Sequence, residues 1–202
     1  MRRRVWTRGR KVMGNLLPAL LFLPPATIGI SMMFLDREIL GRGMPYVVAA
    51  PVLGWLALNL LGHYGNRAMR REMTFRLKAE RSELPPKPVF VGFARPSYHG
   101  LLDAHEDVGH LLLHDDRIEF LGEDHRISLA REQVTAVVFR ANVHTLLGLG
   151  RWVSVEGVVD GKPVRMLIEP RERDTMLGNL LFGRRLRREI ETWLRGRPAK
   201  VG

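Results

Sequence analysis

The sequence contains no cysteine and only five lysines among its 32 basic residues. The absence of cysteine excludes disulfide bonds, thiolate metal sites and a cysteine nucleophile. Charge is absent from two long stretches, "VMGNLLPALLFLPPATIGISMMFL" at 12–35 and "MPYVVAAPVLGWLALNLL" at 44–61. Because a helix of about 20 residues crosses the hydrocarbon core of a bilayer, both stretches are long enough to be membrane spans.

The net charge of +11 is concentrated in two short segments. Residues 1–11 carry +6 and residues 63–81 carry +4, whereas 36–43 is neutral and the long segment 82–202 carries only +1. A nucleic-acid-binding domain is expected to hold its basic excess on the folded unit that contacts phosphate. The charge distribution therefore predicts no nucleic-acid partner.

The two basic segments flank the uncharged stretches on their outer sides. Because lysine and arginine remain on the cytoplasmic side, we predict an α-helical hairpin in the cell inner membrane, with spans at 12–35 and 44–62. Both termini then face the cytoplasm and 36–43 faces outward. No charge lies within the spans, so an anchor is favoured over a transport path. The helices are expected to kink at four prolines, Pro18, Pro24, Pro25 and Pro51. The small residues Ala50 and Gly54 are expected to bring the two helices close together.

Residues 65–82 show a helical pattern, with Met69, Met73 and Leu77 on one stripe. We predict that this segment continues the second membrane helix into the cytoplasm and that its basic residues contact anionic lipid. The stretch "ELPPKP" at 83–88 then ends the helix as a stiff linker. The predicted division is a hairpin at 1–64, a basic helix with linker at 65–88, and a cytoplasmic domain at 89–202. The basic residues of the helix are Arg70, Arg71, Arg76 and Lys78.

After the linker, the hydrophobic period changes from helical to alternating. Strands are predicted at 89–95, 108–114, 117–121, 126–129, 134–140, 151–159 and 163–169. Asp160-Gly161 predicts a tight hairpin turn. Asp174 or Thr175 is expected to cap a helix at 175–195 that ends near Gly196 and Pro198. Its apolar face would carry Phe182, Leu186, Ile190, Trp193 and Leu194.

The stretch "GHLLLHDDRIEFLGEDHRISLAREQVTAVVF" reads as strand, turn, strand, turn and a valine-rich strand. It resembles the bacterial pleckstrin-homology-like and GRAM-type domains, and the resemblance covers about 89–195. It implies an α+β protein whose seven-stranded antiparallel barrel or sandwich is followed by a C-terminal helix, and a binding module rather than a catalyst. The loop "PSYHGLLDAHED" departs from lipid-binding members because it holds three acidic residues and no basic one, which argues against phosphoinositide recognition.

The helix at 175–195 carries the densest basic cluster of the domain. These arginines either face anionic headgroups or an acidic partner, or form a solvated face with local ion pairs to Glu189 and Glu191. The cluster comprises Arg184, Arg185, Arg187 and Arg188.

No pattern of residues predicts an enzyme. The motif "HEDVGH" at 105–110 spaces its histidines by five residues, so they would not share a metal on one helix face, and two histidines at 110 and 114 lie about 13 Å apart along a strand. Ser154 lies in mid-strand rather than in a nucleophile motif. Residues 152–157 with Arg67 and Arg71 match a cyclic-dinucleotide signature only in part, because Trp152 stands where an acid or amide is required. We predict no cofactor and no metal.

The sequence therefore predicts a membrane-anchored cytoplasmic module that binds a lipid headgroup, a membrane-protein partner or copies of itself. The alternative is an accessory subunit of a larger membrane complex. Neither the ligand nor the oligomeric state follows from the residues.

Overall fold

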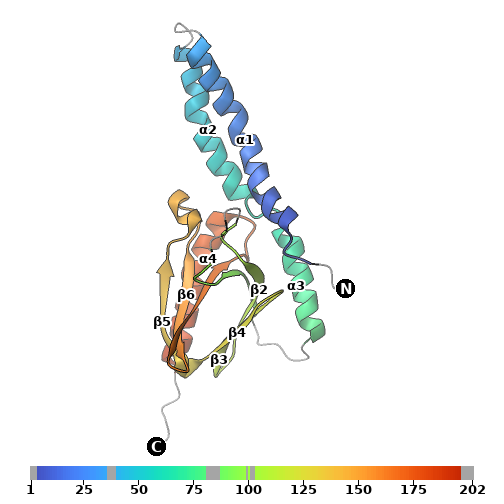
Figure 1. The fold of residues 1–202 in the computed structure, drawn as a ribbon, viewed down its shortest axis with the longest axis vertical. Helices are drawn as coiled ribbons and strands as arrows, with labels where there is room; N and C mark the ends of the chain where they lie inside the picture. Colours follow the sequence, from blue (N-terminus) through green and yellow to red (C-terminus); the bar gives the residue numbers. More distant parts are fainter. Residues whose placement is uncertain (1–3, 36–39, 81–86, 99, 101–102, 197–202) are drawn as a thin grey trace, which may run out of the picture. The chain divides into compact units, whose positions relative to one another are not determined.

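The computed structural model describes residues 4–35, 40–80, 87–98, 100 and 103–196. The chain divides into two compact units, which Figure 1 shows as a helical hairpin and a sheet with helices. The hairpin unit is Arg8–Tyr64. The second unit, here called the sheet unit, consists of Met1–Thr7 and Gly65–Gly202.

The hairpin unit contains α1, Arg8–Leu35, and α2, Leu40–Leu61. Both helices are long and apolar enough to cross a membrane. Each begins four residues before the predicted span, and α1 continues through its three prolines without ending. Of the predicted outward turn at 36–43, residues 36–39 lie outside the described part of the chain.

Small residues set the distance between α1 and α2. A Cβ added at Gly29 would lie 2.8 Å from Val47 Cγ2, and one added at Gly54 would lie 3.0 Å from the ring of Phe22. Ala50 is only 1% exposed. The outer surface of the hairpin is apolar, as the exposed side chains of Leu20, Val48 and Leu60 illustrate.

The sheet unit combines two helices with one antiparallel sheet of seven strands in the order β4-β3-β2-β1-β7-β6-β5. This arrangement confirms the predicted α+β class, and every predicted strand is present within one or two residues of its expected ends. The elements are α3 Asn66–Glu80, β1 Val89–Ala94, β2 Asp107–Leu113, β3 Arg117–Gly122, β4 Arg126–Ala130, β5 Val134–Arg140, β6 Trp152–Val159, β7 Lys162–Pro170 and α4 Met176–Arg195.

The strands form one open sheet, which corrects the expectation of a barrel or sandwich. Its edges are β4 and β5, which follow each other in the chain and are joined by the short 3-10 helix η2, Arg131–Gln133. Within the described residues, the sheet contains no β4–β5 ladder to close it. Five of the strand pairs join strands that are consecutive in the chain. The sixth pair, β1 with β7, joins the two halves of the sheet and places Val91 opposite Pro170.

One face of the sheet forms the main core with α4. Phe93, Phe120 and Ile168 from the strands are fully buried and cluster with Leu186 and Ile190 of α4. Phe182, Trp193 and Leu194 pack around this cluster. The predicted apolar face of this helix is thus confirmed, and its N-cap is Thr175, whose side chain accepts a hydrogen bond from the Gly178 amide.

The opposite face of β1 and β2 is covered as well, by α3 and by residues 4–7. Phe90 of β1 and Val108 of β2 cluster with Met69 and Met73 of α3. The stripe predicted on this helix therefore packs on protein. The predicted continuation of α2 into α3 is wrong, because a turn at 62–65 separates them and Gly65 adopts a left-handed φ of 75°.

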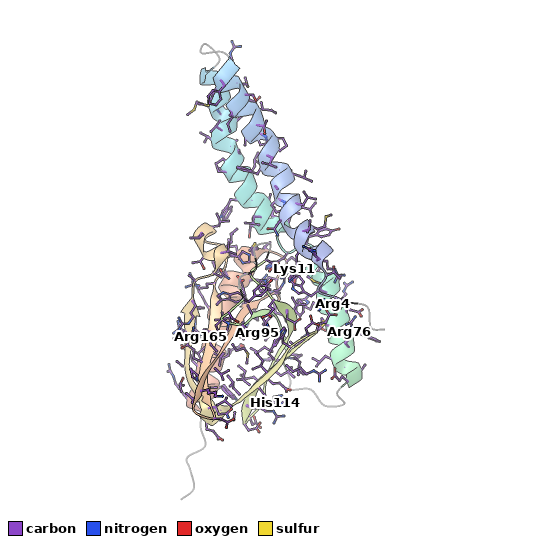
Figure 2. All side chains as sticks on the ribbon, in the orientation of Figure 1. Arg4, Lys11, Arg76, Arg95, His114 and Arg165 are labelled. Carbon is purple, nitrogen blue, oxygen red and sulfur yellow. The ribbon has the colours of Figure 1, made fainter. Side chains whose placement is uncertain are left out.

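Residues 4–6 of the N-terminal segment bind the sheet unit. Glu123, in the β3–β4 turn, accepts hydrogen bonds from the backbone amides of Val5 and Trp6 at 2.6 and 2.7 Å. Arg76 of α3 pairs with the same carboxylate, and Arg4 pairs with the adjacent Asp124. Figure 2 labels both arginines. The basic N-terminus, which we interpreted only as a topology signal, is thus also a structural part of the domain.

Candidate functional site

A cluster of buried charges lies where the N-terminal segment, α3 and the end of β7 meet. His105 is completely buried, with Nδ1 2.6 Å from Asp103 Oδ1 and Nε2 3.1 Å from Glu169 Oε2. Arg171 is also buried; its Nε donates to Asn66 Oδ1 and its Nη1 lies 3.2 Å from His105 Nδ1. We call these five residues the ion cluster.

The charges of the ion cluster balance when His105 is protonated. Burial by itself lowers the pKa of His105, but the charges and hydrogen bonds of Asp103 and Glu169 outweigh it and raise that pKa. Burial likewise opposes ionisation of Asp103, yet His105 and Arg171 bring its pKa well below the usual range. The pKa of Glu169 is lowered in the same way, by His144 and His105. Two buried anions then face two buried cations.

The ion cluster joins four separate segments of the sheet unit. Asn66, at the start of α3, donates to the Arg171 carbonyl. Trp6 donates to the His105 carbonyl and stacks under the Arg171 guanidinium at 4.9 Å. His144, from the β5–β6 connection, lies 3.1 Å from Glu169 Oε2. The cluster therefore fixes the N-terminal segment, α3 and two loops with respect to one another.

Two glycines make room for the ion cluster. A Cβ at Gly92, in the middle of β1, would lie 1.9 Å from His105 Cδ2, and one at Gly150 would lie 2.0 Å from Glu169 Oε1. A glycine inside a strand often marks such a close approach. The glycine in "VFVGFA" was the one sequence signal for this site, and our sequence analysis did not use it.

A basic cleft lies beside the ion cluster, between α3 and the β7–α4 loop. Four arginines line it against two carboxylates. Arg67 pairs with Asp174, and Arg70 pairs with Glu172 at 2.8 Å. The other two arginines, Arg71 and Arg173, are exposed and form no ion pair with any residue in the described part of the chain. We call this feature, lined by Arg67, Arg70, Arg71, Glu172, Arg173, Asp174 and Phe182, the basic cleft.

The structure separates the four basic residues predicted on α3. Arg70 and Arg71 reach the basic cleft. Arg76 points to the sheet instead, where it pairs with Glu72 at 2.9 Å and Glu123 at 3.0 Å. Lys78 is exposed, near the likewise exposed ring of Phe75. The sequence did not indicate Arg173 as a site residue, because it comes from the β7–α4 loop far along the chain.

Of the four arginines on α4, two form the local ion pairs that the sequence suggested, and two remain without an acidic partner among the described residues. Arg185 pairs with Glu189 at 3.0 Å and Arg187 with Glu191 at 2.7 Å, as expected for a solvated helix face. Arg187 also stacks on the ring of Phe139. Arg184 and Arg188 are exposed and have no acidic partner among the described residues.

The histidines make internal contacts of several kinds. His105 belongs to the ion cluster, His110 faces Thr74 of α3, and His114 lies 3.1 Å from Glu119 Oε2; His99 is outside the described residues. Across the described residues, no three His, Asp or Glu side chains are placed to hold a metal ion. Ser154 is buried in β6, with its hydroxyl donating to Glu156.

Burial makes His110 a source of acid sensitivity. Burial, followed by the charge of Arg70, lowers the pKa of His110 from 6.5 to about 4. His110 is therefore protonated near pH 6.5 in the unfolded chain but only near pH 4 in the folded chain. The free energy of unfolding falls as the pH decreases through this window. The difference in pKa corresponds to about 3 kcal/mol at the acidic end.

We expect His110→Gln to flatten the pH dependence of unfolding between pH 6.5 and 4. The measurement is urea unfolding of the full chain in a neutral detergent at a series of pH values. The stability that Asp103 and Glu169 contribute is lost as the pH falls below their unfolded pKa values of 3.8 and 4.5, so the profiles are compared above pH 5. The contribution of His105 is lost only as the pH rises above its unfolded pKa of 6.5. Parallel pH profiles for the variant and the natural chain would contradict the assignment.

Comparisons with known proteins give no match for this chain: no family model, no curated protein and no solved structure is similar to it. The class of protein that the fold and cleft define is an α+β chain that carries two apolar helices and a basic cleft.

Proposed function

We propose that the protein is a membrane-anchored binding module of the cytoplasmic face, which binds an anionic phosphate-bearing headgroup in its basic cleft. The observation that carries this proposal is the pair Arg71 and Arg173, two exposed cations that line the same cleft from α3 and the β7–α4 loop without an acidic partner in the described chain. Guanidinium groups bind phosphate through paired, charge-assisted hydrogen bonds.

The apolar hairpin supports the anchoring part of the proposal. Both helices can cross a membrane, and the basic flanks on their outer sides favour a cytoplasmic location for the sheet unit. The order of the sheet and its C-terminal helix support a pleckstrin-homology-like module, which is part of the proposal. The headgroup site that we propose is not the β1–β2 loop, whose acids bind internal partners: Glu106 pairs with Arg95, and Asp107 accepts backbone hydrogen bonds.

The test uses the full chain in neutral detergent, with dioctanoyl phosphatidylglycerol and dioctanoyl phosphatidylcholine as probes. We expect the anionic lipid to raise the unfolding temperature and the zwitterionic lipid to leave it unchanged, because only a ligand that binds the folded state stabilises it. The double variant Arg71→Gln/Arg173→Gln is expected to weaken this binding about tenfold or more.

Arg184→Gln/Arg188→Gln is the matched control, because it removes the same charge from the exposed face of α4. Equal weakening by both double variants would show a general charge effect and would contradict a site in the cleft. Glycerol phosphate, added in a separate arm, distinguishes a soluble phosphate ligand from a lipid. A stoichiometric protein partner retained in mild detergent, without a lipid effect, would favour an accessory subunit instead.

A further inference from the structure

The connection between β5 and β6 presents a group of apolar side chains to solvent. It contains the short 3-10 helix η3, Val143–Leu147. Leu146 is 87% exposed, Val143 56% and Leu147 49%. Single exposed apolar residues are ordinary, but several on one short turn mark a surface that contacts a membrane or another molecule.

The turn is held firmly in this orientation by its polar residues. Asn142 caps η3 by accepting from the Thr145 amide, and its Nδ2 donates to Glu169 of the ion cluster at 2.9 Å. Thr145 Oγ1 donates to the Gly150 carbonyl at 2.8 Å, and Gly148 ends the turn with a left-handed φ of 67°. The polar side chains thus face the domain and the apolar ones face away, the reverse of an ordinary soluble loop.

The first turns of α4 extend the apolar surface. Leu181 is 54% exposed and Leu177 38%. They lie at the same end of the sheet unit as η3, because α4 runs antiparallel to β5: Arg131, before β5, donates to Gly196, whereas Arg187 stacks on Phe139 near the other end of that strand. Figure 1 shows the short helix of the β5–β6 connection beside the N-terminal end of α4.

The chain leaves the sheet unit for the apolar helices at this same end. Trp6 is buried against the ion cluster, and α1 begins at Arg8. Asn66 is hydrogen-bonded to Arg171, and α2 ends at Leu61, five residues earlier. Five residues span at most about 18 Å. Both covalent connections from the sheet unit to α1 and α2 therefore leave it at this end, through Thr7 and through residues 62–65.

We propose that η3, together with Leu181 of α4, inserts its apolar side chains into the interface of the bilayer, as a second membrane contact that does not span it. Lipid fits this surface better than a protein partner does, because the side chains project from a narrow turn rather than line a groove. The stretch 140–151 contains no acidic residue that would repel anionic headgroups, and its two arginines bind within the domain, Arg140 to Glu156 and Arg151 on the ring of Phe139. The inference rests on the membrane anchoring in the proposed function, and not on the basic cleft.

The absence of cysteine permits a direct test. In the full chain, Leu146→Cys is labelled with a polarity-sensitive fluorophore and reconstituted into phosphatidylglycerol–phosphatidylcholine vesicles. Lys162→Cys, at the β6–β7 turn, is the matched control, because it is exposed and lies one strand of eight residues away, about 26 Å. We expect blue-shifted emission and strong quenching by lipids spin-labelled near the headgroup at position 146, and neither effect at position 162.

Identical emission from the two positions would overturn the insertion, and so would a blue shift at position 146 that lipid-borne quenchers do not reduce, since that result would indicate a protein contact. Alkaline carbonate extraction distinguishes a failure of the membrane anchoring from a failure of the η3 insertion. A chain released by carbonate would overturn the membrane anchoring itself. A chain that resists carbonate but shows no quenching at position 146 would overturn only the insertion of η3.

Discussion

Arg171→Met is expected to lower the free energy of unfolding of the sheet unit by about 3–5 kcal/mol. The methionine side chain fills much of the same space, but it removes one of the cations that balance the buried carboxylates of Asp103 and Glu169. It also removes the hydrogen bond to Asn66 and the contact with the ring of Trp6. The measurement is urea unfolding of the full chain in neutral detergent, followed by tryptophan fluorescence.

Arg95→Met is the matched control for this prediction. Arg95 also pairs with a carboxylate, that of Glu106, but its side chain is exposed, and exposed ion pairs contribute little to stability. Adding Glu169→Gln to Arg171→Met is expected to restore part of the lost stability, because it removes one of the unbalanced charges. An Arg171→Met variant as stable as the Arg95→Met variant would show that the ion cluster is not a determinant of the fold.

Trp6→Ala is expected to destabilise the sheet unit by about 3 kcal/mol. The indole packs with Met69, Met73 and Phe90, and its loss leaves a cavity next to the ion cluster. Residues 4–7 should then detach from Glu123, so that their amides and those of α3 exchange hydrogen faster. Urea unfolding gives the stability, and hydrogen exchange of the full chain in detergent gives the location of the change.

Trp6→Phe keeps an aromatic ring in the same cavity and is expected to cost less than Trp6→Ala, since it mainly loses the hydrogen bond to the His105 carbonyl. Arg4→Gln removes a basic residue of the same segment whose pairing with Asp124 is exposed, and it should leave exchange unchanged. If Trp6→Ala behaved like Arg4→Gln, the N-terminal segment would be a topology signal only.

Local periodicity predicted most of the elements. The strands β1 to β7 and the apolar face of α4 follow from alternating or helical patterns that are contained in a few neighbouring residues. The same patterns predicted the buried stripe of α3 but not what covers it, because a helical stripe does not say whether it packs on protein or continues from a membrane helix. The break at 62–65 depends on a backbone conformation of Gly65 that no pattern indicated.

The basic cleft was only half predictable. Arg70 and Arg71 were recognisable as part of a basic helix, whereas Arg173 joins them because the β7–α4 loop is hydrogen-bonded to Asn66. The sequence could not separate Arg76, which pairs with Glu123, from its exposed neighbours, because that distinction depends on a carboxylate 47 residues away.

By itself, the sequence determined that this chain has two helices with long uncharged stretches and basic flanks, a seven-stranded domain and an amphipathic last helix, since each of these depends on neighbouring residues. Only the tertiary structure decided that Trp6 lies on His105, 99 residues away, that Val5 is bound by Glu123, and that Arg171 reaches His105. These contacts depend on which strands pair and on which charges are buried together. Such choices are made by the free energy of the whole folded unit, and no local stretch of residues encodes them.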